Sequence, residues 1–585
     1  MTHIANNPAD FADEALDGFC DAYASLVERV EGGAVRRSRP AQPKVAVLLG
    51  GGSGHYPAFA GLIGAGFADG AVVGNIFTSP SAQQAASVAR AADSGAGVVF
   101  AYGNYAGDVM NFGVATERLR AEGIRAENVV VTDDVASAPP SELERRRGIA
   151  GDFTVFKVMG AAAESGADLD EVVRLGRKAN HATRTLGTAF AGCTFPGAEH
   201  PLFSLPEGFM GLGLGIHGEP GLRDLPLPRA EDLGRELVAG VLAERPEGAG
   251  RRVVVILNGL GSTKAEELFV LWRTVAPLLR DSGLELVAPE VGELVTSLDM
   301  AGVSLTLMWL DEELEELWLA PAETPAYRRG AVVRNERPAT AEPPVVRSAG
   351  VAGARDVSEA RLASAASREY AAQCLAALAA AQRTLHELEP ELGALDAVAG
   401  DGDHGRGMVR GVDAAVAAAQ DAAAAGSGAG SLLAAAGDAW ADKAGGTSGV
   451  LWGAGLRAWG ETLGDDARPD DGALAAGIAA FAGRILALGG AQPGDKTLVD
   501  ALAPFTAELS AAVERGLPLG EAWTTAADAA ASAAQSTAEL RPRKGRARPL
   551  AEKSVGTPDP GAISLAAVFA AIGPELDPQT ATAAH

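Results

Sequence analysis

Cysteine and basic residues are scarce in this sequence. Its three cysteines, Cys20, Cys193 and Cys374, are far apart and odd in number, which argues against a disulfide framework or a zinc site and favours a reducing cytoplasm. Only 49 lysines and arginines stand against 75 aspartates and glutamates, which gives a net charge of -26. An acidic protein repels phosphate backbones and anionic lipids, so we expect neither nucleic acid nor a membrane as a partner.

Long apolar runs are also missing. No run reaches the ~20 residues that a membrane helix needs. The first residues, MTHIANNPADFADEALDGF, lack the basic and then apolar pattern of a signal peptide. Hydrophobic residues make up 47% and charged residues 21%, which indicates a globular protein. A chain of 585 residues is too long for one core and predicts about two to four domains.

The first half alternates short apolar runs with helical patterns. KVAVLLGGGSGHYPAFAG predicts a buried strand over 45–49 that runs into a glycine-rich turn and His55. Further strands are expected over 71–76, 97–102 and 128–132, with helices between them, whereas residues 1 to about 40 look helical. Alternation of this kind predicts a parallel sheet with helices on its faces and a ligand at the carboxyl ends of the strands.

A second α/β unit is expected from about Gly187. It contains MGLGLGIHGEPG, in which Gly215 and Gly218 flank His217. A strand is predicted over 251–257, and Ser262 or Thr263 is a candidate helix cap. Residues 295–314 predict a helix, a turn at Gly302 and a strand.

The composition changes after the predicted strands. Residues 333–357 are rich in Pro, Ala and Gly without an amphipathic period, and we interpret them as an interdomain linker. From 358 to 585 the chain is alanine-rich with long helical stretches, for example over 361–388, 413–424 and 470–488. This second part predicts an all-α domain.

An acidic loop opens the first connection of that domain. ALDAVAGDGDHGRGMVRG places Asp396, Asp401 and Asp403 within eight residues among glycines, so they can converge on one point after a helix. Oxygen ligands alone favour a hard cation, Mg²⁺ before Ca²⁺ or Zn²⁺, and the alternative is a solvated Asp/Gly turn.

Three more polar, glycine-rich turns follow: KAGGTSGVLWG, GGAQPGDKTLVDAL and GRARPLAEKSVGTPDPGA. A helical bundle needs only short connections, so four such turns are hard to explain as linkers alone. Backbone N–H donors at helix starts together with carboxylates for Mg²⁺ predict a nucleotide-triphosphate site. Asp495 and Lys496 lie in one of these turns; a surface ion pair is one interpretation for them, and their role stays open at this point.

These motifs resemble one family. GGGSGH, FTSPSA, GDVMNF, GLGIHGEPG, GDGDHG, GDKT and DPGA occur in the order found in the single-chain, ATP-dependent dihydroxyacetone kinases, over about residues 13–575. The resemblance implies a ketose-binding α/β K domain over 1–332 in two subdomains, about 1–186 and 187–332, then the linker and an all-α helical-barrel, nucleotide-binding L domain over 358–585.

The resemblance also implies roles. His217 would bond covalently to the substrate carbonyl carbon as a hemiaminal, Asp108 would accept the proton of the attacking hydroxyl, and His55 would hydrogen-bond the substrate. The implied substrate-binding residues are Gly52, Ser53, Gly54, His55 and Asp108. Asp396, Asp401 and Asp403 would hold two Mg²⁺ ions on ATP. The implied nucleotide-binding residues are His404, Gly405, Arg406, Gly407, Thr447, Ser448, Gly489, Leu498, Arg546, Asp559, Pro560 and Gly561.

The chain departs from many of these kinases at Tyr56, Phe59 and Gly103. Many relatives carry glutamate and histidine at the first two positions, and several carry lysine at the third. Loss of a carboxylate and of a long cation near the pocket favours a larger ketose, so we expect a D-erythrulose 4-kinase. Dihydroxyacetone kinase and L-erythrulose kinase are the alternatives.

Other classes stay open at this point. The chain could be a regulatory or phosphocarrier subunit that binds ketose or nucleotide without turnover, and some relatives split FAD in a side reaction. The family suggests a homodimer in which one subunit's L domain faces the other's K domain. The sequence leaves open the sugar enantiomer, the carbon that is phosphorylated and the oligomeric state.

Overall fold

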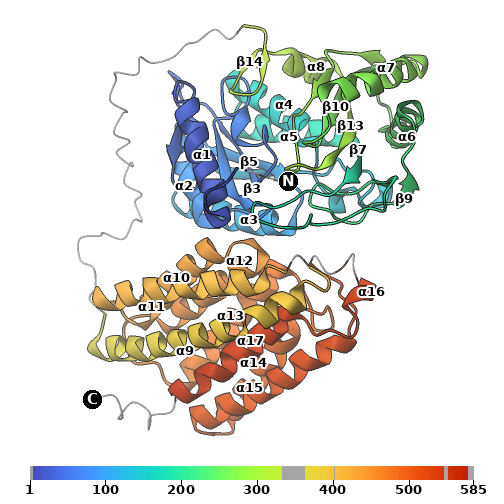
Figure 1. Cartoon of the computed structure of the whole chain (residues 1–585). Coiled ribbons are helices and arrows are strands. Elements are labelled where there is room, and N and C mark those ends of the chain that lie inside the picture. The colour runs from blue at the N-terminus through green and yellow to red at the C-terminus, as the bar shows by residue number, and fades with distance from the viewer. Residues whose placement is uncertain (1–3, 332–362, 401, 546–547, 549–550, 577–585) are drawn as a thin grey trace. The chain divides into compact units, whose positions relative to one another are not determined.

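The computed structural model describes residues 4–331, 363–400, 402–545, 548 and 551–576, which form two compact units (Figure 1). The chain divides into these units between Ala352 and Gly353. The expected linker over 333–357, the expected metal ligand Asp401 and the expected nucleotide residue Arg546 lie outside the described residues.

The first unit begins with a six-stranded sheet in the order β1-β2-β4-β3-β5-β6. β3, β4, β5 and β6 are parallel, as predicted, whereas β1 and β2 join antiparallel. The expectation of helix up to residue 40 is wrong beyond the first helix, because Gly32, at a φ of 85°, turns the chain into a hairpin that pairs with β4. The elements are α1 (Phe11–Ala22), β1 (Val27–Val30), β2 (Gly33–Arg36), β3 (Ala46–Ser53), β4 (Gly70–Ile76), α2 (Ala82–Ala92), β5 (Val98–Gly103), α3 (Ala106–Ala121) and β6 (Ala126–Val131).

Two helices, α4 (Asp152–Glu164) and α5 (Leu169–Ala182), lead to a second sheet. Its order is β11-β10-β13-β7-β8-β9, with β12 also beside β10, and β13 runs antiparallel to both of its neighbours. Buried side chains of α4 pack in one core with residues of both sheets, for example Val47 and Ile256. The elements are β7 (Thr183–Ala191), β8 (Phe209–Leu212), β9 (Arg223–Pro226), α6 (Ala230–Leu242), β10 (Arg252–Gly259), α7 (Ala265–Asp281), β11 (Glu285–Leu286), β12 (Glu290–Gly292), β13 (Ala301–Trp309), α8 (Glu312–Leu319), β14 (Ala322–Glu323) and β15 (Arg328–Arg329).

Two local predictions in this region are wrong. Residues 295–300 are not helical, because their backbone bonds to other segments: Thr296 N–H donates to His55 O and Leu298 N–H donates to Gly54 O. Ser262 and Thr263 do not cap α7, since their hydroxyls donate to the carbonyls of Asp299 and Gly302 and the helix begins after Lys264.

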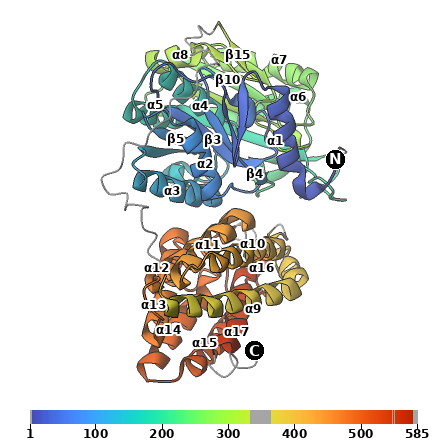
Figure 2. The same cartoon turned by 90° about the vertical axis from the view of Figure 1, so that its left-hand side faces the viewer.

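The second unit is helical, and both views show its long helices side by side (Figures 1 and 2). Each of the helices from α9 to α15 packs on the next, α15 packs on α17, and α17 packs back on α9, so these helices close into a ring. This arrangement confirms the predicted all-α helical barrel. The helices are α9 (Ala365–Asp396), α10 (His404–Ala424), α11 (Ala429–Ala444), α12 (Gly446–Leu463), α13 (Asp471–Gly489), α14 (Val499–Glu514), α15 (Leu519–Ser536), α16 (Ala551–Ser554) and α17 (Pro560–Ile572).

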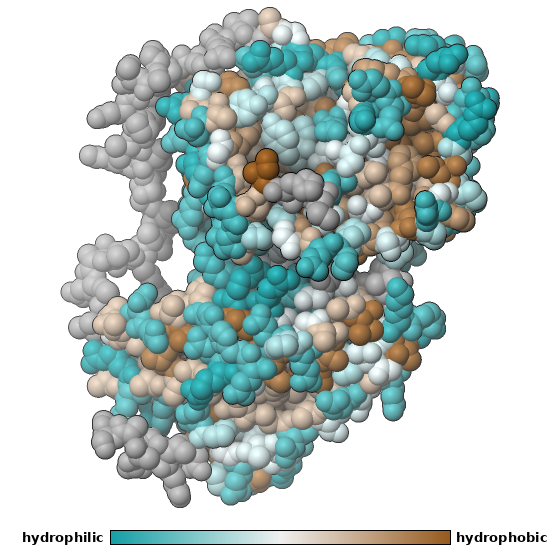
Figure 3. All heavy atoms as spheres, viewed as in Figure 1, coloured by the Kyte–Doolittle hydropathy of each residue, from teal (hydrophilic) through white to brown (hydrophobic). Residues whose placement is uncertain are grey.

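One helix of this barrel, α13, is long and apolar enough to cross a membrane by length and composition alone. It packs between α12 and α14 and buries Leu474, Ile478 and Phe481. A core helix of a barrel meets the same criterion, so this is weak evidence for a span. On the face shown in Figure 3, hydrophilic and apolar residues are interspersed over both units.

Candidate active site

His217 lies in the loop between β8 and β9, in the first unit. Its backbone N–H donates to Glu219 Oε2 and its Nδ1 lies 3.0 Å from Glu219 Oε1. A side chain at Gly215 would collide with this carboxylate, because a Cβ there would lie 2.1 Å from Glu219 Oε2. Glycine at 215 therefore makes room for the carboxylate that orients the imidazole.

His55 follows β3 and faces His217 across the loop. Its Nδ1 donates to the carbonyl of Thr296 at 2.7 Å, and its Nε2 lies 3.1 Å from Nε2 of His217. The ring stacks on Phe77 with centroids 5.0 Å apart. Burial, with the charge of His217 in support, lowers the pKa of His55 to about 3, so His55 is neutral at physiological pH.

Glu219 was not predicted, although it stands two residues after His217 in the same motif. Burial acts to raise the pKa of Glu219, but His217 and Arg147 outweigh it and hold that pKa well below the usual range. Arg147 lies 3.9 Å from Glu219 and 2.7 Å from Asp134. The carboxylate beside His217 is therefore ionised and fixed by a second ion pair.

Two aromatic rings enclose His217 from the sides. Phe77 and Tyr105 each meet it edge-on, with centroids 4.8 and 4.7 Å away. The buried hydroxyl of Tyr105 has no hydrogen-bond partner among the described residues, and burial raises the pKa of Tyr105 well above its ordinary value. The rings hold the imidazole between apolar surfaces, and its Nε2 faces Nε2 of His55.

The other predicted substrate residues lie at the end of β3, directly after it, and in the first turn of α3, which follows β5. Asp108 is buried in the first turn of α3, and Gly54 has a φ of 104°. A Cβ at Gly52 would meet Thr78 N at 2.6 Å, and the hydroxyl of Ser53 donates to Gly74 O. The structure thus brings the ends of the parallel strands to the His55–His217 pair, as ligand sites in such sheets require.

Tyr56, Phe59 and Gly103, at which the chain departs from many dihydroxyacetone kinases, lie in different surroundings. Tyr56 was expected near the pocket, but its ring packs on Phe19 of α1 and its side chain is half exposed. The Phe59 ring lies 6.2 Å from that of His55, and a Cβ at Gly103 would touch Cε2 of Tyr105 at 3.1 Å. Only Phe59 and Gly103 therefore border groups that contact the histidine pair.

The acidic loop of the second unit joins the end of α9 to the start of α10. The carboxylate of Asp396 accepts the backbone N–H groups of Asp403 and His404. Burial, followed by repulsion from Asp396, raises the pKa of Asp403. Such mutual destabilisation of oxygen-only groups is relieved by a hard cation, so the donor set fits Mg²⁺. The described residues alone contain no group of three potential metal ligands.

The start of α17 lies beside the acidic loop between α9 and α10. Nε2 of His404 lies 3.0 Å from Ser564 Oγ, and Asp559 caps α17 by accepting Ala562 N–H. Burial, with Asp500 and Asp396 in support, raises the pKa of Asp559 to about 7. A Cβ at Gly561 would lie 3.5 Å from Leu498, which precedes α14.

Helix starts gather at this end of the barrel, because α10, α12 and α14 begin near the points where α9, α11 and α13 end, and the start of α17 lies beside those of α10 and α14. Gly407 of α10 faces Ala444, where α11 ends, and Thr447 and Ser448 begin α12. Gly489 ends α13 shortly before α14 begins. Exposed N–H groups and positive helix ends favour bound phosphate.

The surface ion pair considered for Asp495 and Lys496 is wrong. Both residues are buried. Lys496 Nζ donates to the carbonyls of Leu540 and Ser554, and Asp495 accepts Gln492 N–H. Lys496 therefore links the residue Leu540, which precedes the last polar turn, to Ser554 within that turn.

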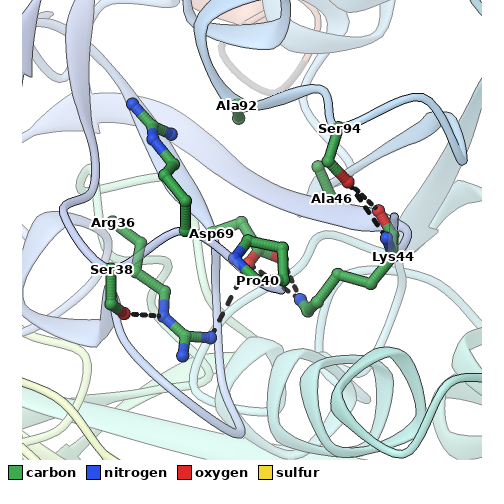
Figure 4. A pocket seen from close by; sticks show the side chains of 9 residues that line it. Arg36, Ser38, Pro40, Lys44, Ala46, Asp69, Ala92 and Ser94 are labelled. Atoms are coloured by element: carbon green, nitrogen blue, oxygen red, sulfur yellow. Dashed lines mark hydrogen bonds and ion pairs between the residues drawn. The ribbon is translucent and has the colours of Figure 1, made fainter. Parts of the chain in front are cut away.

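A hollow in the first unit is lined by charged residues (Figure 4). There Lys44 Nζ lies 2.6 Å from Asp69, and Arg36 lies 2.8 Å from Glu164. Burial acts to raise the pKa of Glu164, but Lys44 and Arg36 outweigh it and lower it. Because these charges are paired with one another, the hollow offers a ligand little free charge.

Known proteins match both units. Residues 17–326 match the Dak1 domain and residues 398–573 the DAK2 domain. The chain is 58% identical to a D-erythrulose kinase of Mycolicibacterium smegmatis, over 97% of each chain. It is 53% identical to an L-erythrulose kinase of Pectobacterium atrosepticum, over 100% of this chain and 98% of the relative.

Solved structures of a related kinase resemble the whole chain. The crystal structure of the dihydroxyacetone kinase of C. freundii superposes with a TM-score of 0.52 at 30% identity, over 98% of this chain and 99% of that one. A second structure of that kinase, in complex with AMP-PNP and Mg²⁺, has the same TM-score at 31% identity. The chain therefore belongs to the family of kinases that join a Dak1 domain to a DAK2 domain. Within that family it falls in the branch of the erythrulose kinases.

Proposed function

We propose that this chain is an ATP-dependent kinase that phosphorylates the terminal hydroxyl at C4 of D-erythrulose while the ketose is bound covalently to His217. The observation that carries the proposal is the His55–His217–Glu219 arrangement, in a chain 58% identical to a D-erythrulose kinase along nearly its whole length. An imidazole that a carboxylate orients through Nδ1, so that Nε2 can form the bond, is the group that addition to a carbonyl requires.

The first unit binds the ketose. His217 adds through Nε2 to the carbonyl carbon, which selects ketones and aldehydes over polyols. Asp108 accepts the proton of the attacking hydroxyl, and Gly52 and Gly54 let the backbone approach the sugar. The hydroxyl of Ser53 is used as a donor within the fold, so it offers the sugar an acceptor.

The second unit binds ATP. Asp396 and Asp403, together with Asp401, would hold two Mg²⁺ ions, whose charge would neutralise the triphosphate. The remaining contacts to the nucleotide come from His404, Gly405, Arg406, Gly407, Thr447, Ser448, Gly489, Leu498, Arg546, Asp559, Pro560 and Gly561. Phosphoryl transfer depends mainly on position and charge, so helix starts and carboxylates suffice on the protein side.

The ketose-binding domain spans 1–332 and the ATP-binding domain spans 358–585. We place the protein in the cytoplasm as a homodimer, in which the ATP-binding domain of one subunit serves the ketose domain of the other. Dihydroxyacetone is the second candidate substrate, because the superposed C. freundii enzyme is a dihydroxyacetone kinase. Gly103, in place of a lysine near the pocket, favours the longer sugar.

The test is an ATP-consumption assay with D-erythrulose, L-erythrulose, dihydroxyacetone, glyceraldehyde and glycerol, and with His217→Ala as the control. We expect turnover with D-erythrulose, none with glycerol, and loss of turnover in the variant. Consumption of glycerol, or no ATP consumption with any ketose, would overturn the proposal.

A further inference from the structure

The two histidines stand in a continuous row of hydrogen-bonding groups. The row runs from Thr296 O to His55, from His55 to His217 and from His217 to Glu219, with contacts of 2.7, 3.1 and 3.0 Å. Both ends of the row are acceptors. A backbone carbonyl can only accept a hydrogen bond, and so can an ionised carboxylate.

The acceptors at the two ends of the row, Thr296 O and the Glu219 carboxylate, determine how many protons the two imidazoles carry. Nδ1 of His55 must carry a hydrogen to meet Thr296 O, and Nδ1 of His217 must carry one to meet Glu219. Two neutral imidazoles would then have no hydrogen left between them. Their Nε2 lone pairs would face each other at 3.1 Å, a repulsive contact in a buried site.

We infer that the free protein keeps a third proton on the His55–His217 pair, that Glu219 retains it there, and that it becomes the hydroxyl hydrogen of the hemiaminal. The second part rests on the function proposed above. The third proton belongs on His217, because His217 contacts the Glu219 carboxylate directly and His55 is almost fully enclosed.

The covalent step then balances without any proton from solvent. The Nε2 proton of His217 passes to the carbonyl oxygen, with Nε2 of His55 as the relay. The freed lone pair of His217 Nε2 forms a bond to the carbonyl carbon as the C=O π bond breaks and its electrons become an O–H bond. The alkylated ring keeps its Nδ1 hydrogen and its positive charge, so the ion pair with Glu219 is the same before and after.

The charged and neutral groups around the His55–His217 pair favour a single positive charge on that pair. Arg147 lies on the far side of Glu219 and is itself paired with Asp134. Tyr105, whose pKa is raised, contributes an uncharged ring at the side of His217. Cys193 is buried in the same region, and burial raises the pKa of its thiol to about 11, so it is neutral as well.

Glu219 is thus a positioning residue. Its negative charge, in addition to its hydrogen bond, retains the third proton on His217. Glu219→Gln separates the two effects, since an amide oxygen still accepts Nδ1–H but no longer compensates a cation. A matched control exists in the second unit, where Nε2 of His386 lies 2.8 Å from Asp413 Oδ1 with no second histidine in the contact. Asp413→Asn removes the charge from that pair and leaves His217 untouched.

The decisive experiment is ¹⁵N NMR of the full-length, ketose-free protein with labelled histidine at pH 7, with the His217 signals assigned from their loss in His217→Asn. We expect both ring nitrogens of His217 to be protonated and His55 to carry hydrogen on Nδ1 alone. In Glu219→Gln we expect His217 to lose one proton, and in Asp413→Asn no change. A neutral His217 in the unmodified free protein, or an imidazolium that persists in Glu219→Gln, would overturn the inference.

Calorimetry of D-erythrulose binding in buffers of different ionisation enthalpy tests the transfer. The unmodified protein should exchange no net proton, and Glu219→Gln should take up about one proton from the buffer. Uptake of a proton by the unmodified protein would contradict the transfer. If D-erythrulose does not bind at all, the proposed function fails, whereas the proton count is still decided by the NMR experiment.

Discussion

At the scale of single residues, Gly103 borders the ring that holds His217. A Cβ there would lie 3.1 Å from both Tyr105 Cε2 and the carbonyl of Gly148, so any side chain must displace one of them slightly. Gly103→Lys should lower kcat/KM for D-erythrulose at least about tenfold and change that for dihydroxyacetone less, because the longer sugar needs more space.

Gly103→Ala is the control, since it adds the Cβ without the cation. Steady-state kinetics of both variants with both sugars separate crowding from charge. An unchanged preference in Gly103→Lys would remove this residue from the account of specificity.

Lys157, in the core of the first unit, predicts a pH-dependent stability. It is fully buried and donates to Leu317 O, and burial, with Arg329 in support, lowers its pKa from 10.5 to about 7. Between these values the unfolded chain binds more protons than the folded one, so this lysine's contribution to stability declines as the pH falls from about 10 to about 7 and is constant below. Lys157→Met should therefore stabilise the unit by roughly a few kcal/mol near pH 7 and by much less near pH 10.

Thermal or urea unfolding of the first unit in the full-length protein at both pH values measures this difference. A gap between Lys157→Met and the unmodified protein that stays constant from pH 7 to pH 10 would contradict the prediction.

Which residues form the site was partly predictable. His55, His217 and Asp108 were expected from their glycine-rich motifs, and the structure brings the two histidines into contact. Glu219 was missed, because its link to His217 depends on a turn whose geometry requires Gly215 and is not visible in a residue pattern. Roles that involve a bound ligand, such as the binding of Mg²⁺ by Asp396, stay predictions.

At the scale of elements, the close packing of α9 and α10 sets where the acidic loop lies. A Cβ at Gly405 would lie 2.2 Å from Glu389 O on α9, whereas a Cβ at Gly407 would lie 3.6 Å from Ala444 O. Gly405→Ala should cost about 1–3 kcal/mol of stability and raise the KM for ATP, because α10 must move away from α9.

Gly407→Ala, two residues further on the same helix, should fold with little loss. Thermal unfolding and ATP kinetics of the two variants compare these effects. Equal stability of both would show that the contact between α9 and α10 does not set the loop.

The elements that could be predicted are those whose structure depends on residues close by in the sequence. Ser81 and Gln84 form the capping box of α2, and the long helices of the second unit follow from alanine-rich stretches. That the segment over 295–300 is not helical could not be predicted, since its backbone partners His55 and Gly54 lie about 240 residues earlier in the chain. The hairpin of β1 and β2 likewise depends on pairing with β4.

At the scale of the whole molecule, we expect the two units to divide the substrates between them. His217→Asn should abolish ketose binding and leave ATP binding intact, whereas Asp403→Asn should do the reverse and lower kcat by about a hundredfold or more. Calorimetric titration of each variant with each ligand checks the division. Loss of both ligands in one variant would point to misfolding or to one shared site.

The proposed homodimer makes a related prediction. When His217→Ala and Asp403→Ala chains are mixed and allowed to exchange subunits, dimers with transfer between subunits should recover about a quarter of the unmodified activity. No recovery, with exchange verified by native mass spectrometry, would exclude transfer between subunits.

The central claim is the preference for the four-carbon ketose, and a competition experiment measures it directly. Equal concentrations of D-erythrulose and dihydroxyacetone compete for limiting ATP, and ³¹P NMR counts the two sugar phosphates. We predict that D-erythrulose phosphate exceeds dihydroxyacetone phosphate by about tenfold or more, because the ratio of products equals the ratio of kcat/KM. A mixture with more dihydroxyacetone phosphate than D-erythrulose phosphate would contradict the account.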